Sequence, residues 1–113
     1  MSTSIPDIYR YEAQRIDTLL FNDVYGYFTE HNGLGEGSES YRKGDASYLR
    51  TIKPISFQGL MIHLQSEPLV PGWLFRQQRG MIVELTAIGT NIEVKLEDVL
   101  QKFNFKVKER NPF

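Results

Sequence analysis

From residue 46 onward, short apolar segments alternate with turns rich in glycine, proline and asparagine, the pattern of a chain that returns on itself strand by strand. A parallel return needs a crossover of about a dozen residues or more, and most of these connections are shorter. We therefore expect antiparallel pairing. The segments expected as strands are 48–52, 55–65, 73–75, 81–88, 92–96 and 104–110, with two helical turns over 97–103.

The first part of the chain carries apolar or small residues at steps of three and four, the spacing of one buried helix face. These positions are Tyr9, Ala13, Ile16, Leu20, Val24 and Tyr27. Ser4 followed by Asp7 matches a capping box, and Gly33 can take the left-handed conformation that ends a helix. We therefore predict one long amphipathic helix over 5–32. Gly26 inside it predicts a close approach by another backbone.

Residues 33–45 (GLGEGSESYRKGD) are rich in glycine, serine and charge, which predicts an exposed, flexible loop. No segment has the length of a linker to a second domain, so we expect one domain over residues 1–113, with 46–110 as its β-rich part. The predicted fold class is α+β. The long N-terminal helix would pack on a curled antiparallel sheet, or on a small β-barrel, of about five or six strands.

The composition of the chain excludes several kinds of site and argues against some classes of partner. The chain has no cysteine, which excludes disulfides, thiolate zinc sites and cysteine nucleophiles. Its net charge of −1 argues against coating nucleic acid through bulk charge. No apolar run approaches the length of a membrane span, and the N-terminal MSTSIPD lacks the build of a signal peptide. We expect a cytoplasmic protein without membrane contact.

Residues suited to catalysis or metal binding are sparse. The two histidines are His31, at the expected helix end, and His63, within the expected strand LMIHL, and no serine stands in a G-x-S-x-G elbow. Glu36, Glu39 and Asp45 could join His31 as hard ligands, but the spacing fits neither a zinc helix nor a calcium loop. We predict no catalytic site, no metal site and no cofactor, and therefore a protein that is not an enzyme.

A second stripe on the expected helix is aromatic. Phe21, Tyr25 and Phe28 recur at steps of four and three, with Leu19 nearby. One small sheet covers one side of a helix, so this stripe either meets another partner or is buried by a sheet that wraps further. Exposed aromatic residues are typical of protein interfaces. The stripe Leu19, Phe21, Tyr25 and Phe28 therefore predicts an interaction or assembly subunit that binds itself or another protein.

The alternative function is binding of nucleic acid or a nucleotide. The expected last strand places cations on one face and phenylalanine on the other, and sheets that present cations and aromatic rings hold single-stranded nucleic acid. The candidate anion contacts are Arg76, Arg79, Lys106, Lys108 and Arg110. A lysine row on an edge strand also protects a sheet from edge-to-edge aggregation, so both interpretations remain open.

Residues 55–62 (ISFQGLMI), followed by 67–72 (EPLVPG), resemble the second half of a PilZ domain. Ser56 and Gly59 match the family motif [D/N]-x-S-x-x-G, whereas Pro54 stands at the position of the acidic or amide residue. The resemblance implies a small β-barrel and cyclic di-GMP as a ligand. The family's R-x-x-x-R pair, which would bind phosphate through bidentate contacts, has no counterpart in this sequence.

Overall fold

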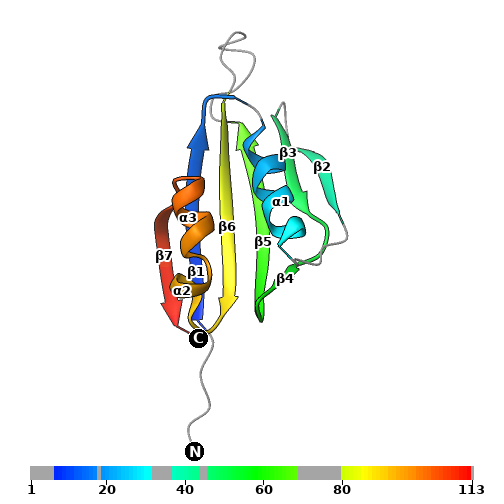
Figure 1. Ribbon diagram of the computed structural model, residues 1–113. Helices are drawn as coiled ribbons and strands as arrows, with labels where there is room; N and C mark the ends of the chain where they lie inside the picture. Colours follow the sequence, from blue (N-terminus) through cyan, green and yellow to red (C-terminus); the bar gives the residue numbers. More distant parts are fainter. Residues whose placement is uncertain (1–6, 18, 32–36, 44–45, 69–79, 113) are drawn as a thin grey trace, which may run out of the picture.

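The described residues form one antiparallel sheet of seven strands with three helices on one of its faces (Figure 1). The computed structural model describes residues 7–17, 19–31, 37–43, 46–68 and 80–112. The strands are β1 (Asp7–Arg15), β2 (Ser38–Lys43), β3 (Ala46–Thr51), β4 (Ile55–Phe57), β5 (Leu60–Pro68), β6 (Met81–Gly89) and β7 (Lys106–Pro112). The helices are α1 (Leu20–Glu30), α2 (Ile92–Lys95) and α3 (Glu97–Lys102). The strand order is β2-β3-β5-β6-β1-β7, and the short β4 pairs with β5.

The prediction of one long helix over 5–32 is wrong. Strand β1 occupies the first half, where it lies between β6 and β7. Tyr9, Tyr11 and Ala13 alternate with polar residues, and this period of two turns one face of β1 into the core. Ile16, which the helical spacing required to be buried, is 82% exposed. The helix begins only at Leu20, after the Asp17 carboxylate accepts a hydrogen bond of 3.0 Å from the Leu19 N–H.

The loop predicted over 33–45 is also corrected, because Ser38–Lys43 form strand β2 at one edge of the sheet. This strand pairs antiparallel with β3, and Tyr41 lies directly opposite Tyr48. Residues 32–36 and 44–45 of the predicted loop lie outside the described residues. The paired tyrosines supply the β propensity that the surrounding glycines and charges concealed.

Two of the expected strands differ from the structure. The segment 55–65 contains two strands, β4 and β5, joined by a tight turn in which Gln58 (φ 50°) and Gly59 (φ 81°) are both left-handed, as a two-residue hairpin requires. The segment 92–96 is helical, because Ile92 and Leu96 are buried at a step of four. Strand β6, helix α3 and strand β7 lie where the sequence predicts them. The expected strand 73–75 is outside the described residues.

The sheet is open, so the predicted barrel is wrong, and so is the barrel implied by the PilZ resemblance. Strand β7 pairs with β1 alone and β2 with β3 alone among the described strands, which leaves both as edges. A barrel would bury its core inside the closed sheet. Here the helices supply the second layer of the core instead (Figure 1).

The core lies between the sheet and the three helices. Helix α1 covers β5 and β6 (Figure 1) and buries Leu20, Phe21, Val24 and Phe28. Gly26 is on the outer side of this helix: a Cβ built there would meet nothing within 4 Å. The close backbone approach predicted at Gly26 is therefore wrong.

Candidate functional site

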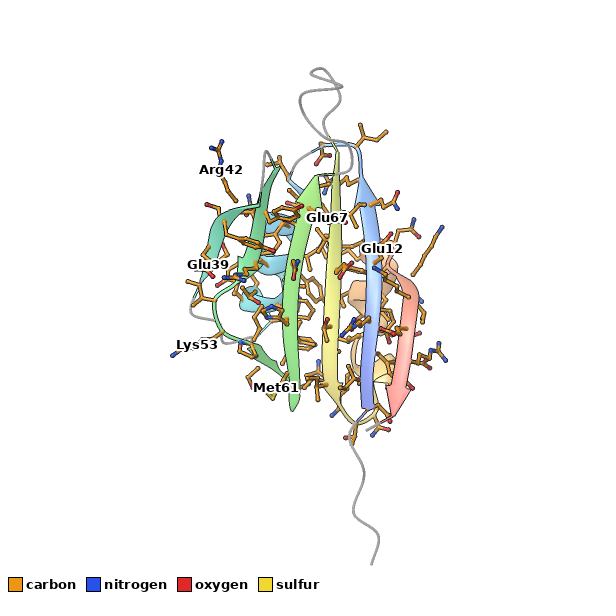
Figure 2. All side chains as sticks on the ribbon, turned by 180° about the vertical axis from the view of Figure 1, so that it is seen from behind. Glu12, Glu39, Arg42, Lys53, Met61 and Glu67 are labelled. Atoms are coloured by element: carbon orange, nitrogen blue, oxygen red, sulfur yellow. The ribbon has the colours of Figure 1, made fainter. Side chains whose placement is uncertain are left out.

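The face of the sheet opposite the helices, here called the open face, is uncovered by any helix of the described chain and carries polar and apolar side chains (Figure 2). Its composition follows from strand alternation, because residues directly opposite each other in neighbouring strands share a face. The antiparallel register places these side chains in four rows across β5, β6 and β1: Met61–Ile88–Ile8, His63–Thr86–Arg10, Gln65–Glu84–Glu12 and Glu67–Ile82–Gln14.

The first row of the open face is apolar. Met61 is 52% exposed, and it lies beside the half-buried Ile88, which is itself opposite Ile8. Figure 2 shows Met61 at one end of β5. Three aliphatic side chains side by side on a solvent-facing surface form a contiguous apolar strip, the kind of feature that marks contact sites.

The charged residues of the open face are largely paired with one another. The Lys108 ammonium lies 2.7 Å from a Glu84 oxygen and 3.6 Å from a Glu12 oxygen. At the other edge, the Arg50 guanidinium lies 2.7 Å from the Glu39 carboxylate. The Glu84 carboxylate, and after it the Glu12 carboxylate, raises the pKa of Lys108. The face therefore presents neutralised ion pairs instead of a field of one sign.

Two stacked tyrosines extend the open face over β2 and β3. The rings of Tyr41 and Tyr48 lie 5.2 Å apart at an interplanar angle of 20°. The Arg50 guanidinium lies 4.4 Å from the Tyr41 ring centre, and the Gln65 amide donates a hydrogen bond of 3.1 Å to the Tyr41 hydroxyl. The pair is a fixed aromatic surface, because stacking, a cation and a hydrogen bond hold Tyr41 from three sides.

His63, in the second row, lies 2.8 Å from the Thr51 hydroxyl through its Nδ1 atom. Burial, and then the nearby Arg50 cation, lower the pKa of His63 below its usual 6.5. Its neutral imidazole therefore bridges β5 and β3. Thr51 itself is buried, and its hydroxyl also accepts a hydrogen bond of 3.3 Å from the Leu64 N–H. Among the described residues, the hydrogen-bond partner of the His63 ring is this threonine and not a serine or a carboxylate.

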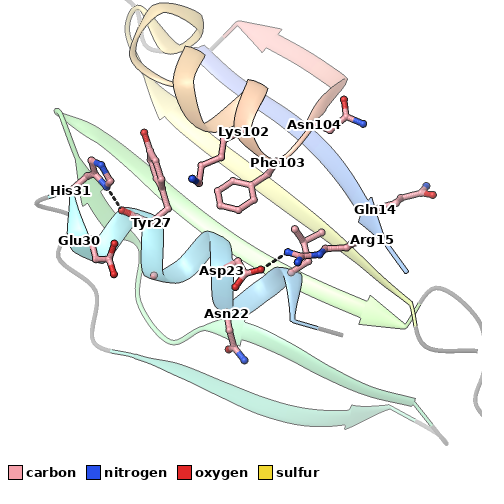
Figure 3. Close-up of a pocket in the computed structure, with 12 residues that line it drawn as sticks. Gln14, Arg15, Asn22, Asp23, Tyr27, Glu30, His31, Lys102, Phe103 and Asn104 are labelled. Carbon is pink, nitrogen blue, oxygen red and sulfur yellow. Dashed lines mark hydrogen bonds and ion pairs between the residues drawn. The ribbon is translucent and has the colours of Figure 1, made fainter. Parts of the chain in front are cut away.

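A second surface is the groove of about 800 Å³ between α1 and the end of α3 (Figure 3). Arg15 forms ion pairs with Asp17 and Asp23 on one side of it. On the other, the rings of Tyr27 and His31 stack at 4.2 Å, and Tyr27 meets Phe103 edge to face at 6.0 Å. The groove has the size of a small-molecule site, but its guanidinium is already occupied by two carboxylates.

The predicted aromatic interface is mostly core. Phe21 and Phe28 are both fully buried, and Tyr25, half-buried, stacks on Phe21 at 6.3 Å. Leu19 alone of the four is exposed, at 56%. The sheet covers enough of α1 to bury the second stripe, which is the alternative that the sequence left open, so Phe21 and Phe28 are unavailable to a partner of the folded chain.

The predicted cation cluster is divided between two faces. Lys106 and Lys108 lie next to Glu12 at the β7 edge of the open face. Arg110 lies on the helix side, 5.4 Å from the Tyr9 ring centre and in an ion pair of 2.6 Å with Glu93. Arg76 and Arg79 fall outside the described residues.

Sequence reasoning missed the open face because it assigned residues 7–15 to a helix. The missed signal is the alternation in three strands of polar residues with buried ones: Arg10 and Glu12, His63 and Gln65, Glu84 and Thr86. Each set becomes one face once the strands are paired.

The described residues contain no group of three His, Asp or Glu side chains placed to hold a metal ion. None of the helices in the described part of the chain is long and apolar enough to cross a membrane. No protein-family model, curated protein or solved structure matches the chain.

Proposed function

We propose that this protein is a non-enzymatic interaction module whose working surface is the open face of the sheet. The apolar strip carries the proposal: Met61, Ile88 and Ile8 lie side by side on a surface that the helices of the described residues leave uncovered. Burial of such a strip against a complementary surface is favourable by roughly 25 cal/mol per Å² of apolar area before the costs of association.

The paired charges favour a protein partner over nucleic acid. A phosphate backbone is bound by cations that release counterions, whereas Lys108 is held by Glu84 and Glu12, and Arg50 by Glu39. Those carboxylates would also repel phosphate. The open face instead combines an apolar strip, two stacked tyrosines and ion pairs that neutralise one another, which are residue types found in protein interfaces.

The proposal is tested by placing a charge in the apolar strip. Met61→Glu sets a carboxylate at the β5 end of the strip, and Val94→Glu sets one at a 75% exposed position on α2, on the other side of the molecule. Proteins retained by the immobilised wild type are identified, purified and titrated by calorimetry against all three forms. We expect Met61→Glu to weaken binding at least about tenfold and Val94→Glu to leave it unchanged. Equal affinity for all three forms would overturn the proposal.

A further inference from the structure

We propose that the open face binds a second copy of this chain, stacked face to face about a twofold axis that runs along the strands between β5 and β6. The inference rests on the proposed function and names the partner. A twofold interface uses the same surface on both subunits, so the surface must be complementary to itself.

The size of the open face fits such a dimer. Six strands spaced by about 4.8 Å are about 24 Å across, and nine residues at about 3.3 Å are about 30 Å long; β1, β5 and β6 have nine residues each. The resulting area of roughly 700 Å² is close to the value of about 800 Å² per partner in stable complexes. The whole face, and not one corner, would be buried.

The apolar strip meets itself under this axis. Rotation about an axis parallel to the strands keeps each row at its own height and exchanges β5 with β6. Met61 then lies against Ile88 of the partner subunit, and Ile88 against Met61 of the partner subunit. An axis running across the strands would instead lay Met61 over the partner subunit's Glu67, a carboxylate of the same strand. The axis along the strands therefore places Met61 against an aliphatic side chain, and at the other end of β5 it places Glu67 against Ile82 of the partner subunit.

The charged row is complementary under the same operation. This row runs Glu39, Arg50, Gln65, Glu84, Glu12 and Lys106 across the sheet. Counted outward from the axis, Gln65 meets the partner subunit's Glu84, Arg50 meets the partner subunit's Glu12, and Glu39 meets the partner subunit's Lys106. Each contact joins an acid to a cation or an amide. Lys106 has no ion pair within the described chain, and this contact would supply one.

A reciprocal charge exchange tests the arrangement. In a dimer of Arg50→Glu, the new carboxylate faces Glu12 of the partner subunit at both contacts, and the two charges repel. In a dimer of Glu12→Lys, the new ammonium faces Arg50 of the partner subunit at both contacts, and these charges also repel. When the two variants are mixed, both contacts become attractive again, because each carries the charge that the other lacks. Lys102→Glu on α3, on the helix side, is the matched control.

The measurement is solution mass by light scattering between about 1 and 500 µM, with native mass spectrometry of the mixture. We expect a wild-type dimer, at least about tenfold weaker association for each single variant, and a heterodimer that restores the affinity in the mixture. Circular dichroism verifies that each variant is folded. A dimer of Lys102→Glu as stable as the wild-type dimer completes the expected pattern.

Three results would overturn the inference, and they are separable from a failure of the proposed function. A wild-type protein that stays monomeric over the whole range excludes the second copy, while Met61→Glu still decides the function of the open face with other proteins. A dimer that Arg50→Glu, Glu12→Lys and Met61→Glu all leave intact uses another surface. A mixture that fails to recover the affinity overturns the axis.

Discussion

Phe28 meets Phe57 edge to face, with 5.0 Å between ring centres and 77° between ring planes. The contact joins helix α1 to the short strand β4, which lies off the main path of the sheet. Both rings are buried. An edge-to-face pair of this kind adds about 0.5–1.5 kcal/mol to the effect of burial alone.

Phe28→Ala should therefore destabilise the fold by about 3–5 kcal/mol, because it removes a fully buried ring from a packed core. Urea denaturation followed by circular dichroism measures the change. Leu19→Ala, at an exposed position one residue before the helix, is the control and should shift stability by less than about 0.5 kcal/mol. An unchanged urea midpoint for Phe28→Ala would show that α1 does not pack on β4.

Alanine should have opposite effects at two glycines. Gly26→Ala should stabilise the protein by about 0.5–1 kcal/mol, because the new methyl group meets nothing within 4 Å and glycine weakens a helix interior. Gly89→Ala should destabilise it, because φ is +153° and the Cβ would lie 2.5 Å from a Leu60 methyl group. Thermal denaturation of the two variants side by side gives the comparison. Shifts of the same sign would contradict the backbone described here.

Tyr11→Phe should preserve or increase stability, by up to about 1 kcal/mol. The Tyr11 hydroxyl is buried without a hydrogen-bond partner in the described structure, and an unsatisfied buried polar group is unfavourable. Tyr41→Phe, which removes the acceptor of the Gln65 amide, should instead lose about 0.5–1.5 kcal/mol. A larger loss for Tyr11→Phe than for Tyr41→Phe would mean that the Tyr11 hydroxyl has a partner.

Tyr11→Phe should also change how the stability of the fold depends on pH above pH 10.0. Burial, followed by the charge of Glu93, raises the pKa of Tyr11 from 10.0 to about 12. The folded state therefore keeps a proton that the unfolded state releases, and stability should fall as the pH rises from 10.0 toward about 12. Tyr11→Phe should show a smaller loss than the wild type over that interval in urea titrations.

Lowering the pH should reduce the stability of the fold through protonation of His63. Its pKa in the folded state is below 6.5 because the ring is half-buried and faces Arg50, so the unfolded state binds the proton more readily. The stability that depends on a neutral His63 is therefore fully present above about pH 6.5 and decreases as the pH falls below that value. His63→Gln should reduce the difference in unfolding free energy between about pH 7.5 and pH 5. An identical difference in both proteins would remove His63 as the cause.

The sequence predicts the second half of the fold better than the first, for a physical reason. Residues 81–89 are apolar enough that the local sequence alone predicts a strand there, and β6 occupies this segment. Residues 9–16 satisfy both a period of two and a period near 3.6, and the choice depends on partners in β6 and β7 that no local window contains. Pairing with β6 and β7 makes this segment a strand and not a helix. The open face could not be predicted as long as the segment was assigned to a helix.

The aromatic stripe was ambiguous for a related reason. Phe21 and Phe28 have the spacing of a helix face, but spacing does not tell whether the layer beneath is wide enough to cover them. That width depends on the number of strands joined in one sheet. The described residues form one sheet of seven strands, and this sheet is wide enough to bury Phe21 and Phe28.

The position of β1 between β6 and β7 has a consequence for how the protein folds. Arg15 pairs with Met81, so α1 and strands β2 to β5 all lie between these partners in the sequence. During synthesis β1 emerges first and stays unpaired until β6 and β7 have followed, while β2 to β5 can form hairpins locally. Pairing over such long sequence separations carries a large loop-closure cost and slows folding. We therefore expect insertion of β1 to be the step that completes the sheet, with Tyr9 and Tyr11 unpaired until then.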